Sequence, residues 1–257
     1  MTTPMSFDVA ELEARVKYLY RSVAEDPTRP YHFPIGRRLA EQLGYPPRVL
    51  DGIPAAAIES FVGVGYFFDL ADLAEGEEVV DLGSGSGTDS FYAALQVGTG
   101  GRVEGVDMTD EQLAKAERLR SEGAFPHVTF TNARIEQLPF PDASFDAVIS
   151  NGVFNLNPDK ASVFREASRV LRSGGRLAIA DIISDSPLPE EVVGNVDLWA
   201  TCVGGAAHRA AYRSDIEAAG MRVEVIRTND YEFGTAQAKD ACETYGINSV
   251  GVLARKV

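Results

Sequence analysis

The sequence of 257 residues contains few of the residue types that form metal clusters or disulfide frameworks. Its only histidines, His32, His127 and His208, show no paired spacing of metal ligands, so no metal site is expected. Two cysteines, Cys202 and Cys242, are too few for a disulfide framework and suggest free thiols. No apolar run approaches the roughly 18–20 residues that span a bilayer. The first eight residues also lack the basic flank and apolar stretch of a secretion signal. These absences predict a soluble, cytoplasmic protein without a membrane partner.

Positive charge is also scarce. The chain has 24 Lys and Arg residues against 38 Asp and Glu residues, which gives a formal net charge of −14. Such a surface repels phosphate backbones, so no nucleic-acid partner is expected. The content of 45% hydrophobic and 24% charged residues is that of a globular protein rather than a disordered one. The length allows one large α/β domain or two small ones.

The N-terminal third predicts short helices. The segment Phe7–Asp26 carries one apolar stripe at helical spacing, formed by Val9, Leu12, Val16, Leu19 and Val23. A helix packed on the main core is one interpretation of this stripe, and a lid over a bound ligand is the other. Six prolines in residues 27–65 limit regular structure to short pieces such as Ile35–Leu43 and Ala55–Ser60. Residues 1–75 are therefore predicted to form an N-terminal helical cap.

From about residue 77 the pattern alternates between strands and helices. Seven strands are expected, at Glu78–Leu82, Arg102–Asp107, Val128–Asn132, Phe145–Ser150, Arg176–Ile183, Met221–Thr228 and Asn248–Ala254. Strands that alternate with helices imply right-handed crossovers and a parallel sheet. The predicted fold class is α/β, with a doubly wound, mostly parallel seven-stranded sheet. Residues 76–184 would form its ligand-binding core, and residues 185–257 a substrate-side insertion followed by the C-terminal strands of the same domain.

Helix boundaries in this region follow from local signals. One helix should follow the glycine loop after the first strand and run through Leu95. Thr109 is expected to cap the next helix, with Gln112 as its partner in a capping box. A helix over Asp159–Leu171 should stop at Gly174-Gly175, and a further helix is expected at Ser214–Ala219.

The motif that carries most chemistry is Asp81-Leu-Gly83-Ser-Gly85-Ser-Gly87, between the first strand and its helix. Closely spaced glycines allow a sharp turn and a close approach to a ligand, and a helix N-terminus offers free N–H groups. A dinucleotide fingerprint needs G-x-G-x-x-G, but here the third glycine comes one residue early. The negative charge of Asp81 would also repel a pyrophosphate, whereas it would attract a cationic amino-acid moiety. The motif therefore favours S-adenosylmethionine over a dinucleotide.

Further candidate ligand contacts follow later strands. Asp107 ends the second strand, where a carboxylate can accept hydrogen bonds from both ribose hydroxyls; the alternative for it is a helix-capping acid before Thr109. After the third strand, Ile135 could pack on an adenine ring and Glu136 could accept its exocyclic amine. Asn151 ends the fourth strand, at the edge where open α/β sheets hold ligands.

At this point the sequence resembles a known family. The motifs Asp81–Gly87, Val106–Thr109, Leu138–Asp142 with Ser144–Asp146, and Leu171–Arg176 are similar to those of class I S-adenosylmethionine-dependent methyltransferases. This resemblance implies a Rossmann-like fold and a donor site at Asp81, Gly83, Ser84, Gly85, Gly87, Asp107, Met108, Ile135, Glu136 and Asn151.

The resemblance extends to one branch of that family. Ser150–Leu156, Pro158–Lys160, Leu198–Gly205 and Tyr245–Ser249 are similar to segments of arsenite methyltransferases, and the likeness covers most of residues 60–257. That family holds trivalent arsenic with three cysteine thiolates, because soft centres suit sulfur. Two of the three positions carry no thiol here, at Val64 and Gly152, and only Cys202 matches.

These residues do not identify the methyl acceptor. A direct displacement at a sulfonium methyl needs alignment and exclusion of water rather than a catalytic triad. Cys202 and His208 are candidate catalytic residues, and Tyr31, Tyr66, Trp199 and Tyr212 are candidates to line an acceptor pocket. The leading hypothesis is a methyltransferase of a small-molecule acceptor with a changed or relaxed acceptor site. The alternatives are an active arsenite or methylarsenite methyltransferase that uses Cys202, and a non-catalytic ligand sensor or nicotinamide-dependent oxidoreductase. The sequence does not indicate an oligomeric state.

Overall fold

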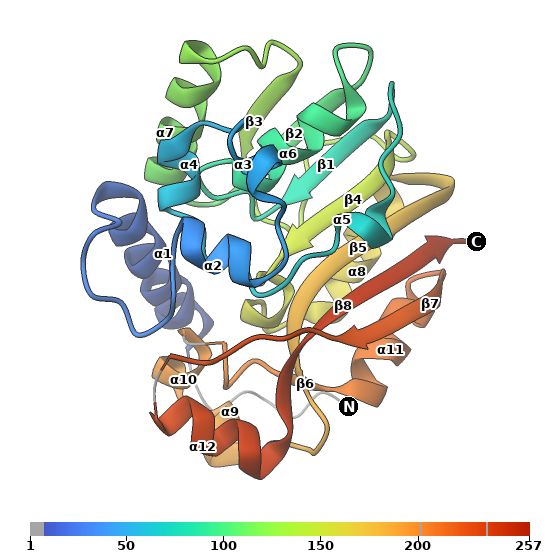
Figure 1. Cartoon of the computed structure of the whole chain (residues 1–257). Helices are drawn as coiled ribbons and strands as arrows, with labels where there is room; N and C mark the ends of the chain where they lie inside the picture. Colours follow the sequence, from blue (N-terminus) through green and yellow to red (C-terminus); the bar gives the residue numbers. More distant parts are fainter. Residues whose placement is uncertain (1–7, 201, 235) are drawn as a thin grey trace.

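The structure is a computed structural model that describes residues 8–200, 202–234 and 236–257. Its centre is one sheet with the strand order β3-β2-β1-β4-β5-β8-β7 (Figure 1). Strands β1 to β5 run parallel, and β8 runs antiparallel to β5 and β7. The bounds are β1 Glu78–Leu82, β2 Arg102–Asp107, β3 Val128–Asn132, β4 Phe145–Asn151, β5 Leu171–Ser184, β7 Met221–Thr228 and β8 Ile247–Lys256. The predicted doubly wound, mostly parallel sheet is confirmed.

The sheet has one strand beyond the seven predicted. Strand β6, Ala207–His208, pairs in parallel with Ile183 and Ser184 at the end of β5. A two-residue strand has no hydrophobic period of its own, because alternation needs several residues to show. Its position depends on β5, which runs on to Ser184.

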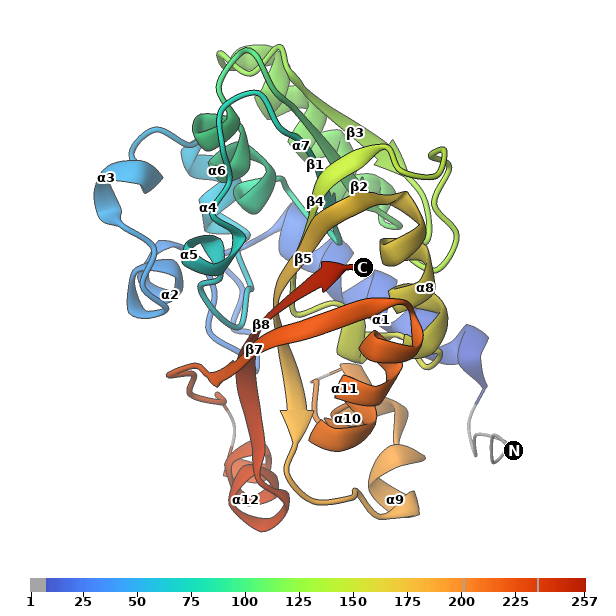
Figure 2. The same cartoon turned by 90° about the vertical axis from the view of Figure 1, so that its right-hand side faces the viewer.

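Helices cover both faces of the sheet, as Figure 2 shows. Helices α6 (Thr88–Val97) and α7 (Asp110–Glu122) share one apolar cluster with the N-terminal helices, whereas α8 (Lys160–Val170) and α11 (Arg209–Ala218) pack in a second cluster. The strands between the clusters are buried on both faces: in β4, all four residues from Ala147 to Ser150 are buried. Runs of this kind are typical of a parallel sheet covered by helices.

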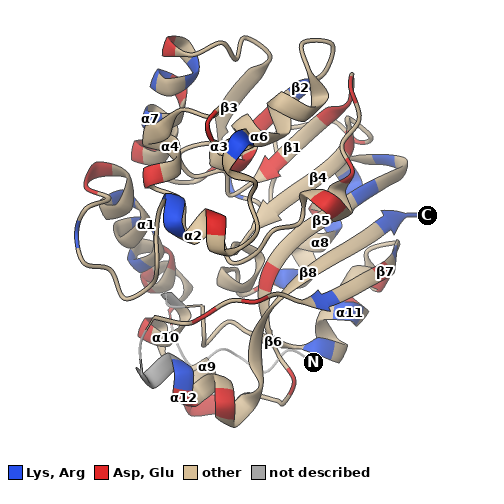
Figure 3. Cartoon of the chain, viewed as in Figure 1, with Lys and Arg blue, Asp and Glu red and all other residues tan. Residues whose placement is uncertain are grey.

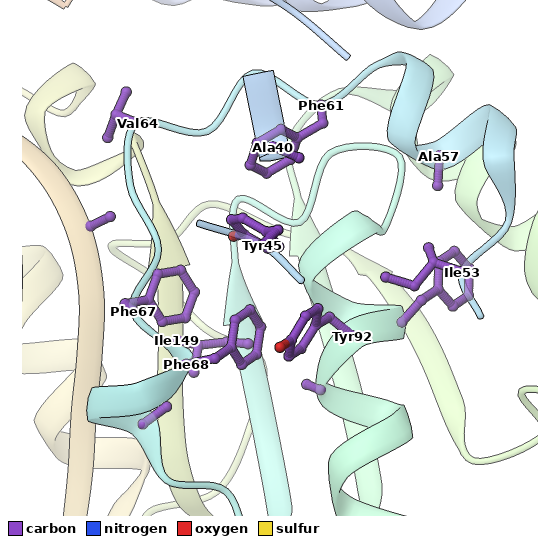
Figure 4. Close-up of a cluster of buried hydrophobic side chains, with 14 of the residues drawn as sticks. Ala40, Tyr45, Ile53, Ala57, Phe61, Val64, Phe67, Phe68, Tyr92 and Ile149 are labelled. Atoms are coloured by element: carbon purple, nitrogen blue, oxygen red, sulfur yellow. The ribbon is translucent and has the colours of Figure 1, made fainter. Parts of the chain in front are cut away.

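The N-terminal segment contributes α1 (Val9–Glu25), α2 (Arg37–Gln42), α3 (Pro47–Leu50), α4 (Ala55–Glu59) and α5 (Phe68–Ala71). Aromatic side chains join this segment to the sheet (Figure 4). The Tyr45 ring lies 5.1 Å from that of Phe61 and 5.6 Å from that of Tyr92 on α6, measured between centroids. Edge-to-face pairs of this geometry stabilise beyond their buried area by about 0.5–1.5 kcal/mol each. The N-terminal helices therefore share the main core.

Short elements complete the chain near the end of β5. These are the 3-10 helix η1 (Phe154–Leu156) and the helices α9 (Glu190–Val193), α10 (Val196–Ala200) and α12 (Ala236–Tyr245). In Figure 1, α9, α10 and α12 gather beyond the ends of β5 and β8.

Some boundaries differ from prediction for identifiable reasons. The part of the expected first helix before Asp8 lies outside the described residues, and Asp8 caps α1 by accepting the N–H of Ala10 at 2.8 Å. Helix α8 ends at Val170, because Leu171 is already extended and pairs with Phe145 of β4. Helix α11 begins at Arg209, five residues before the predicted start.

The predicted capping box of α7 is wrong. Thr109 is the N-cap, but its side chain makes no cap hydrogen bond. Gln112 is buried, donates from Nε2 to the Tyr20 carbonyl at 2.8 Å and accepts the Ser86 hydroxyl at 2.5 Å. Gln112 therefore makes tertiary hydrogen bonds in place of the capping hydrogen bond that the motif requires. Through these bonds it joins α1 to the glycine loop.

No described helix has the length and apolar character needed to cross a bilayer. In Figure 3, Lys and Arg positions and Asp and Glu positions are interspersed over the helices and strands. The absence of a nucleic-acid partner remains a prediction from net charge.

Candidate functional site

A cavity of about 1160 Å³, counted with its open mouth, lies at the carboxyl ends of β1, β2 and β4. One wall is α1, which contributes Val9, Leu12, Glu13, Val16 and Tyr20 and lies beside these strand ends in Figure 1. Nine of the ten residues predicted for the donor site line the cavity: Asp81, Gly83, Ser84, Gly85, Asp107, Met108, Ile135, Glu136 and Asn151. The tenth, Gly87, is the N-cap of α6 and does not line it. The α1 stripe both packs on the core and walls this cavity, so the two interpretations of it are compatible.

The glycine loop requires its glycines for different reasons. Gly83 and Gly85 have φ angles of +75° and +52°, in the left-handed region that favours glycine. A Cβ on Gly83 would lie 2.2 Å from a methyl carbon of Val153. A Cβ on Gly85 would have as its nearest neighbour the Gln112 Oε1, at 3.7 Å. Packing thus forbids a side chain at Gly83. At Gly85 the space beside the Cα is open, and Gly85 lines the cavity.

We therefore expect Gly83→Ala and Gly85→Ala to differ in stability. Gly83→Ala combines backbone strain with a clash and should cost about 2–5 kcal/mol, which lowers the melting temperature by roughly 5–15 °C. Gly85→Ala has only the backbone cost of about 1–2 kcal/mol. Thermal unfolding of the two purified variants measures the difference, and equal melting temperatures would contradict the loop geometry.

Asp107 ties the end of β2 to the glycine loop. Its Oδ2 accepts the N–H of Gly85 at 3.0 Å, and its Oδ1 accepts the N–H of Thr109 at 2.8 Å. Burial raises the pKa of Asp107 despite these hydrogen bonds. The carboxylate also lines the cavity, so the contact with the Thr109 N–H leaves it beside the space where a ligand would lie.

Two further carboxyl groups are buried at the cavity. Asp81 accepts the Ser90 hydroxyl at 2.6 Å, and Asp89 accepts the Tyr45 hydroxyl at 2.6 Å and the Asn151 amide at 3.1 Å. Burial raises the pKa of Asp89 to about 6. Burial and the neighbouring Asp89 raise the pKa of Asp81 well above its usual range. Two such groups side by side favour a cation between or beside them.

The charges of the lining residues support a seat for a cation. Among the described residues that line the cavity, Arg134 is the one basic side chain. Its guanidinium is held by Glu13 at 2.5 Å and by Glu136 at 2.6 Å. Asp81, Asp89 and Asp107 therefore face the cavity without a basic partner among its walls. Sequence reasoning missed Asp89, because an acid in the first turn of a helix is common for its interaction with the helix dipole.

Asn151 shapes the side of the cavity away from α7. Its Oδ1 accepts the N–H of Val64 at 2.7 Å, and its Nδ2 donates to the carbonyl of Gly65 at 3.0 Å. This brings Val64 against Gly152, where an added Cβ would lie 3.3 Å from the Val64 Cγ1. The two positions that match cysteines of the arsenite methyltransferase family are thus adjacent in space.

Cys202 lies behind the α1 wall and does not line the cavity. It packs against the cluster of Leu12, Val16, Leu156 and Trp199, and burial raises the pKa of its thiol to about 11. Cys242 on α12 is also a free thiol with a pKa raised to about 11, mainly by burial. Burial, with smaller contributions from Cys202 and Cys242, raises the pKa of Tyr231, so both thiols are near this side chain.

The other acceptor candidates lie elsewhere. His208 is on β6, paired with Ser184, and does not line the cavity. Tyr31, Tyr66, Trp199 and Tyr212 do not line it either; Tyr212 is fully buried, with its hydroxyl on Asp181 at 2.5 Å. Tyr20, which sequence reasoning did not select, does line the cavity. Only the packing of α1 against α7 and α10 reveals it.

Comparisons with known proteins agree with this fold. Residues 73–235 match the family model described as a methyltransferase domain. An arsenite methyltransferase from Halobacterium salinarum is 39% identical over 193 residues, which is 74% of this chain and 49% of that protein. The chain thus spans about half the length of this curated relative.

Solved structures show the same likeness. An arsenic (III) S-adenosylmethionine methyltransferase from Chlamydomonas reinhardtii has a TM-score of 0.70 at 32% identity, over 82% of this chain and 73% of that one. A geranyl diphosphate C-methyltransferase from Streptomyces coelicolor has a TM-score of 0.68 over 100% of this chain and 99% of that one, and at 21% identity it shows the fold alone.

The fold and the cavity at its strand ends define a Rossmann-like methyltransferase architecture. The chain belongs to the methyltransferase-domain family, and within it the chain resembles arsenite methyltransferases.

Proposed function

We propose that the protein transfers a methyl group from S-adenosylmethionine to a small-molecule acceptor. The observation that carries the proposal is the set of three buried or half-buried carboxylates, Asp81, Asp89 and Asp107, around the glycine loop. A cavity with this charge suits a ligand that carries an ammonium, a sulfonium and a ribose. It disfavours a pyrophosphate, so we prefer this cofactor to a dinucleotide.

A second feature supports the fit of this cofactor. The hydroxyl of Ser84 is buried, lines the cavity and has no hydrogen-bond partner within the described part of the chain. Buried polar groups are almost always hydrogen-bonded, so an unpaired hydroxyl beside a cavity indicates a ligand contact. In the proposed complex, Asp81 and Asp89 hold the amino-acid moiety and Asp107 the ribose. Ile135 and Glu136 contact the adenine.

The reaction requires little acid or base catalysis from the protein. S-adenosylmethionine, when bound, supplies an activated methyl group. The residues of this chain bind and orient the two reactants, and the α1 wall with Leu12 and Val16 excludes water from them. Alignment and desolvation of this kind account for a large part of the barrier reduction in such displacements. No general base needs to be assigned.

We propose that the acceptor is not arsenite. The adjacent positions Val64 and Gly152 carry no thiol, and Cys202 is protonated near neutral pH, so three thiolates for trivalent arsenic are lacking. The lining near these positions is instead apolar, with Phe61, Val62 and Val153. A neutral, largely apolar acceptor fits this lining best.

Ligand-dependent melting tests the cofactor. S-adenosylhomocysteine should raise the melting temperature, and NAD should not, because only a ligand of the native state stabilises it. Mass spectrometry of reactions with arsenite, thiols and phenols then tests the acceptor by the gain of one methyl group. Stabilisation by NAD alone would overturn the donor assignment, and robust arsenite methylation would overturn the acceptor assignment.

The affinity for S-adenosylhomocysteine should rise with pH through about pH 6. In the unliganded protein, the pKa of Asp89 is about 6, so the carboxyl is protonated below that pH. An ammonium favours the carboxylate, so binding releases a proton and strengthens as pH rises, by at most tenfold per pH unit for one group. The contribution of Asp89 to this rise should level off above pH 7.

Calorimetric titration between pH 5 and pH 8 measures this dependence. Asp89→Asn should flatten it, whereas Asp240→Asn, at an exposed position on α12, should leave it unchanged. An affinity that is independent of pH in the wild type would argue against a role for Asp89 in holding the ligand.

A further inference from the structure

Lys160, the first residue of α8, has an ammonium buried behind the cavity wall. The residue is 9% exposed, and within the described residues it forms no ion pair. Its Nζ donates to the carbonyl of Asn155 at 3.2 Å and to that of Asn157 at 3.1 Å. The Trp199 ring covers it, with 4.8 Å from Nζ to the ring centroid. Burying an ammonium is costly, so the two hydrogen bonds and the cation–π contact that compensate for the burial of Lys160 indicate a specific role.

The two carbonyls belong to the wall of the cavity. Asn155 and Asn157 flank Leu156, and Leu156, Asn157 and Pro158 line the cavity. This stretch includes the end of η1 and leads directly into α8. By bonding both carbonyls, the ammonium replaces partners that a short 3-10 segment lacks at its end. The Lys160 ammonium therefore fixes the position of these lining residues relative to a ligand in the cavity.

The same contacts connect the wall to the segment that carries Cys202. Asn155 is fully buried, and its Nδ2 donates to the carbonyl of Cys202 at 3.1 Å. Cys202 has a φ of +65°, a backbone conformation that is costly for a residue with a side chain. Trp199 packs with Leu12, Val16 and Leu156, and its Nε1 donates to the carbonyl of Val193 at 2.6 Å. Lys160 thus lies where η1, α10 and the Cys202 segment meet.

The charge on Lys160 depends on its surroundings. Burial lowers its pKa to about 8, against the attraction of Asp181 on β5 and Asp215 on α11. Asp181 has a pKa raised to about 6 by burial, accepts the Tyr212 hydroxyl and accepts the N–H of Asn155 at 3.2 Å. The pKa of Asp215 is raised by burial as well. Near pH 7 the lysine is largely charged, and Asp181 is largely ionised.

We propose that Lys160 is a positioning residue for one wall of the cavity: its ammonium, between the Asn155 and Asn157 carbonyls and the Trp199 indole, holds the Leu156–Pro158 wall against the Cys202 segment. This inference rests on the proposed function, in which the cavity lined by this wall holds the methyl donor and the acceptor. It assigns Lys160 no contact with the reacting atoms. Loss of the ammonium should loosen the wall and the Cys202 segment together, and with them the hydrogen bond that Asn157 donates to Glu136 at 2.8 Å.

Fluorescence tests the contact without any acceptor, because Trp199 is the only tryptophan of the chain. Loss of the proton from Lys160 removes the cation from the indole face, so the wild-type emission should change in a transition centred at about pH 8. Lys160→Met should abolish the transition. Lys160→Arg should also abolish it, because arginine stays charged over this range. Lys17→Met, at a half-exposed lysine on α1, is the control and should keep it.

Thiol labelling tests the positioning itself. In a Cys242→Ser background Cys202 is the only cysteine, and its reaction with iodoacetamide at pH 7.5 reports how firmly its segment is held. Lys160→Met should speed labelling at least fivefold, and Lys160→Arg should stay within twofold of the background.

The outcomes separate this inference from the proposed function. A transition near pH 8 that persists in Lys160→Met, or labelling of Cys202 that Lys160→Met leaves unchanged, would overturn the role of Lys160. Failure of the wild type to bind S-adenosylhomocysteine would overturn the donor assignment. The fluorescence and labelling results would keep their meaning, because neither experiment needs a bound ligand. If Lys160→Met does not fold, the wild type and Lys160→Arg decide: a pH 8 transition in both contradicts the proposal.

Discussion

Asp107→Ala is expected to reduce the affinity for S-adenosylhomocysteine at least 100-fold. The substitution removes the carboxylate that we assign to the ribose hydroxyls, and also the acceptor of the Gly85 and Thr109 N–H groups. Hydrogen bonds to a charged group contribute about 1.5–3 kcal/mol each, so the loss of two to the ribose corresponds to roughly 3–6 kcal/mol, or two to four orders of magnitude in Kd. Isothermal titration calorimetry measures the change directly.

Two further variants make this result specific. Asp107→Asn keeps one oxygen acceptor and should give an intermediate affinity, whereas Asp240→Ala on the exposed side of α12 should bind like the wild type. Melting of the unliganded Asp107→Ala protein identifies any general loss of folding, since the glycine loop and the N-cap of α7 each lose one hydrogen bond. An affinity within threefold of wild type in a folded Asp107→Ala protein would refute the ribose assignment.

Introducing two cysteines should create an arsenite site that the wild type lacks. In the double variant Val64→Cys with Gly152→Cys, the new thiols lie at adjacent positions beside the cavity. The third thiol would be Cys202, which packs behind the α1 wall, so the variant also tests whether Cys202 reaches the new pair. Val64→Cys also removes the methyl group that an added Cβ at residue 152 would meet at 3.3 Å. Gly152 has a φ of +72°, so its replacement costs about 1–2 kcal/mol of stability. We expect arsenite to bind at least 100-fold more tightly than to the wild type, because trivalent arsenic prefers sulfur.

The control for the arsenite site is Cys202→Ser in the double variant, which should remove most of the gain. Cys242→Ser in the same background should not. Near-ultraviolet absorption of arsenic–sulfur bonds and calorimetry both report binding. A wild-type protein that binds arsenite as tightly as the double variant would show that the acceptor site has not diverged, and that other groups replace the missing thiols.

Much of the fold was predictable because its signals are local. The strand at Glu78–Leu82 matches β1 at both ends, and Arg102–Asp107 matches β2. Buried strands bounded by turn residues are visible in a short window of sequence. Helix α7 shows the limit of such signals: Thr109 takes the N-cap position, but Gln112 is used by the Tyr20 carbonyl and the Ser86 hydroxyl.

The donor side of the site was more predictable than the acceptor side for the same reason. Asp81, Gly83 and Gly85 stand together in one motif, and Asp107 ends a predicted strand, so the topology of a parallel sheet brings them to one edge. Asp89 was missed although it is two residues beyond Gly87, because only burial against Tyr45 and Asn151 distinguishes it from an ordinary helix acid. His208 was selected for its place in the chain, and the structure puts it on β6, outside the cavity.

By itself, the sequence determined the order of strands and helices, the glycine turn behind Asp81 and the lack of thiols at Val64 and Gly152. These features depend on residue types and on neighbours a few positions apart. Only the tertiary structure decided that Tyr20 faces the cavity, that Val64 touches Gly152 and that Lys160 lies under Trp199. Each of these contacts joins segments tens of residues apart, and their geometry follows from how the helices pack on the sheet, which no local pattern encodes.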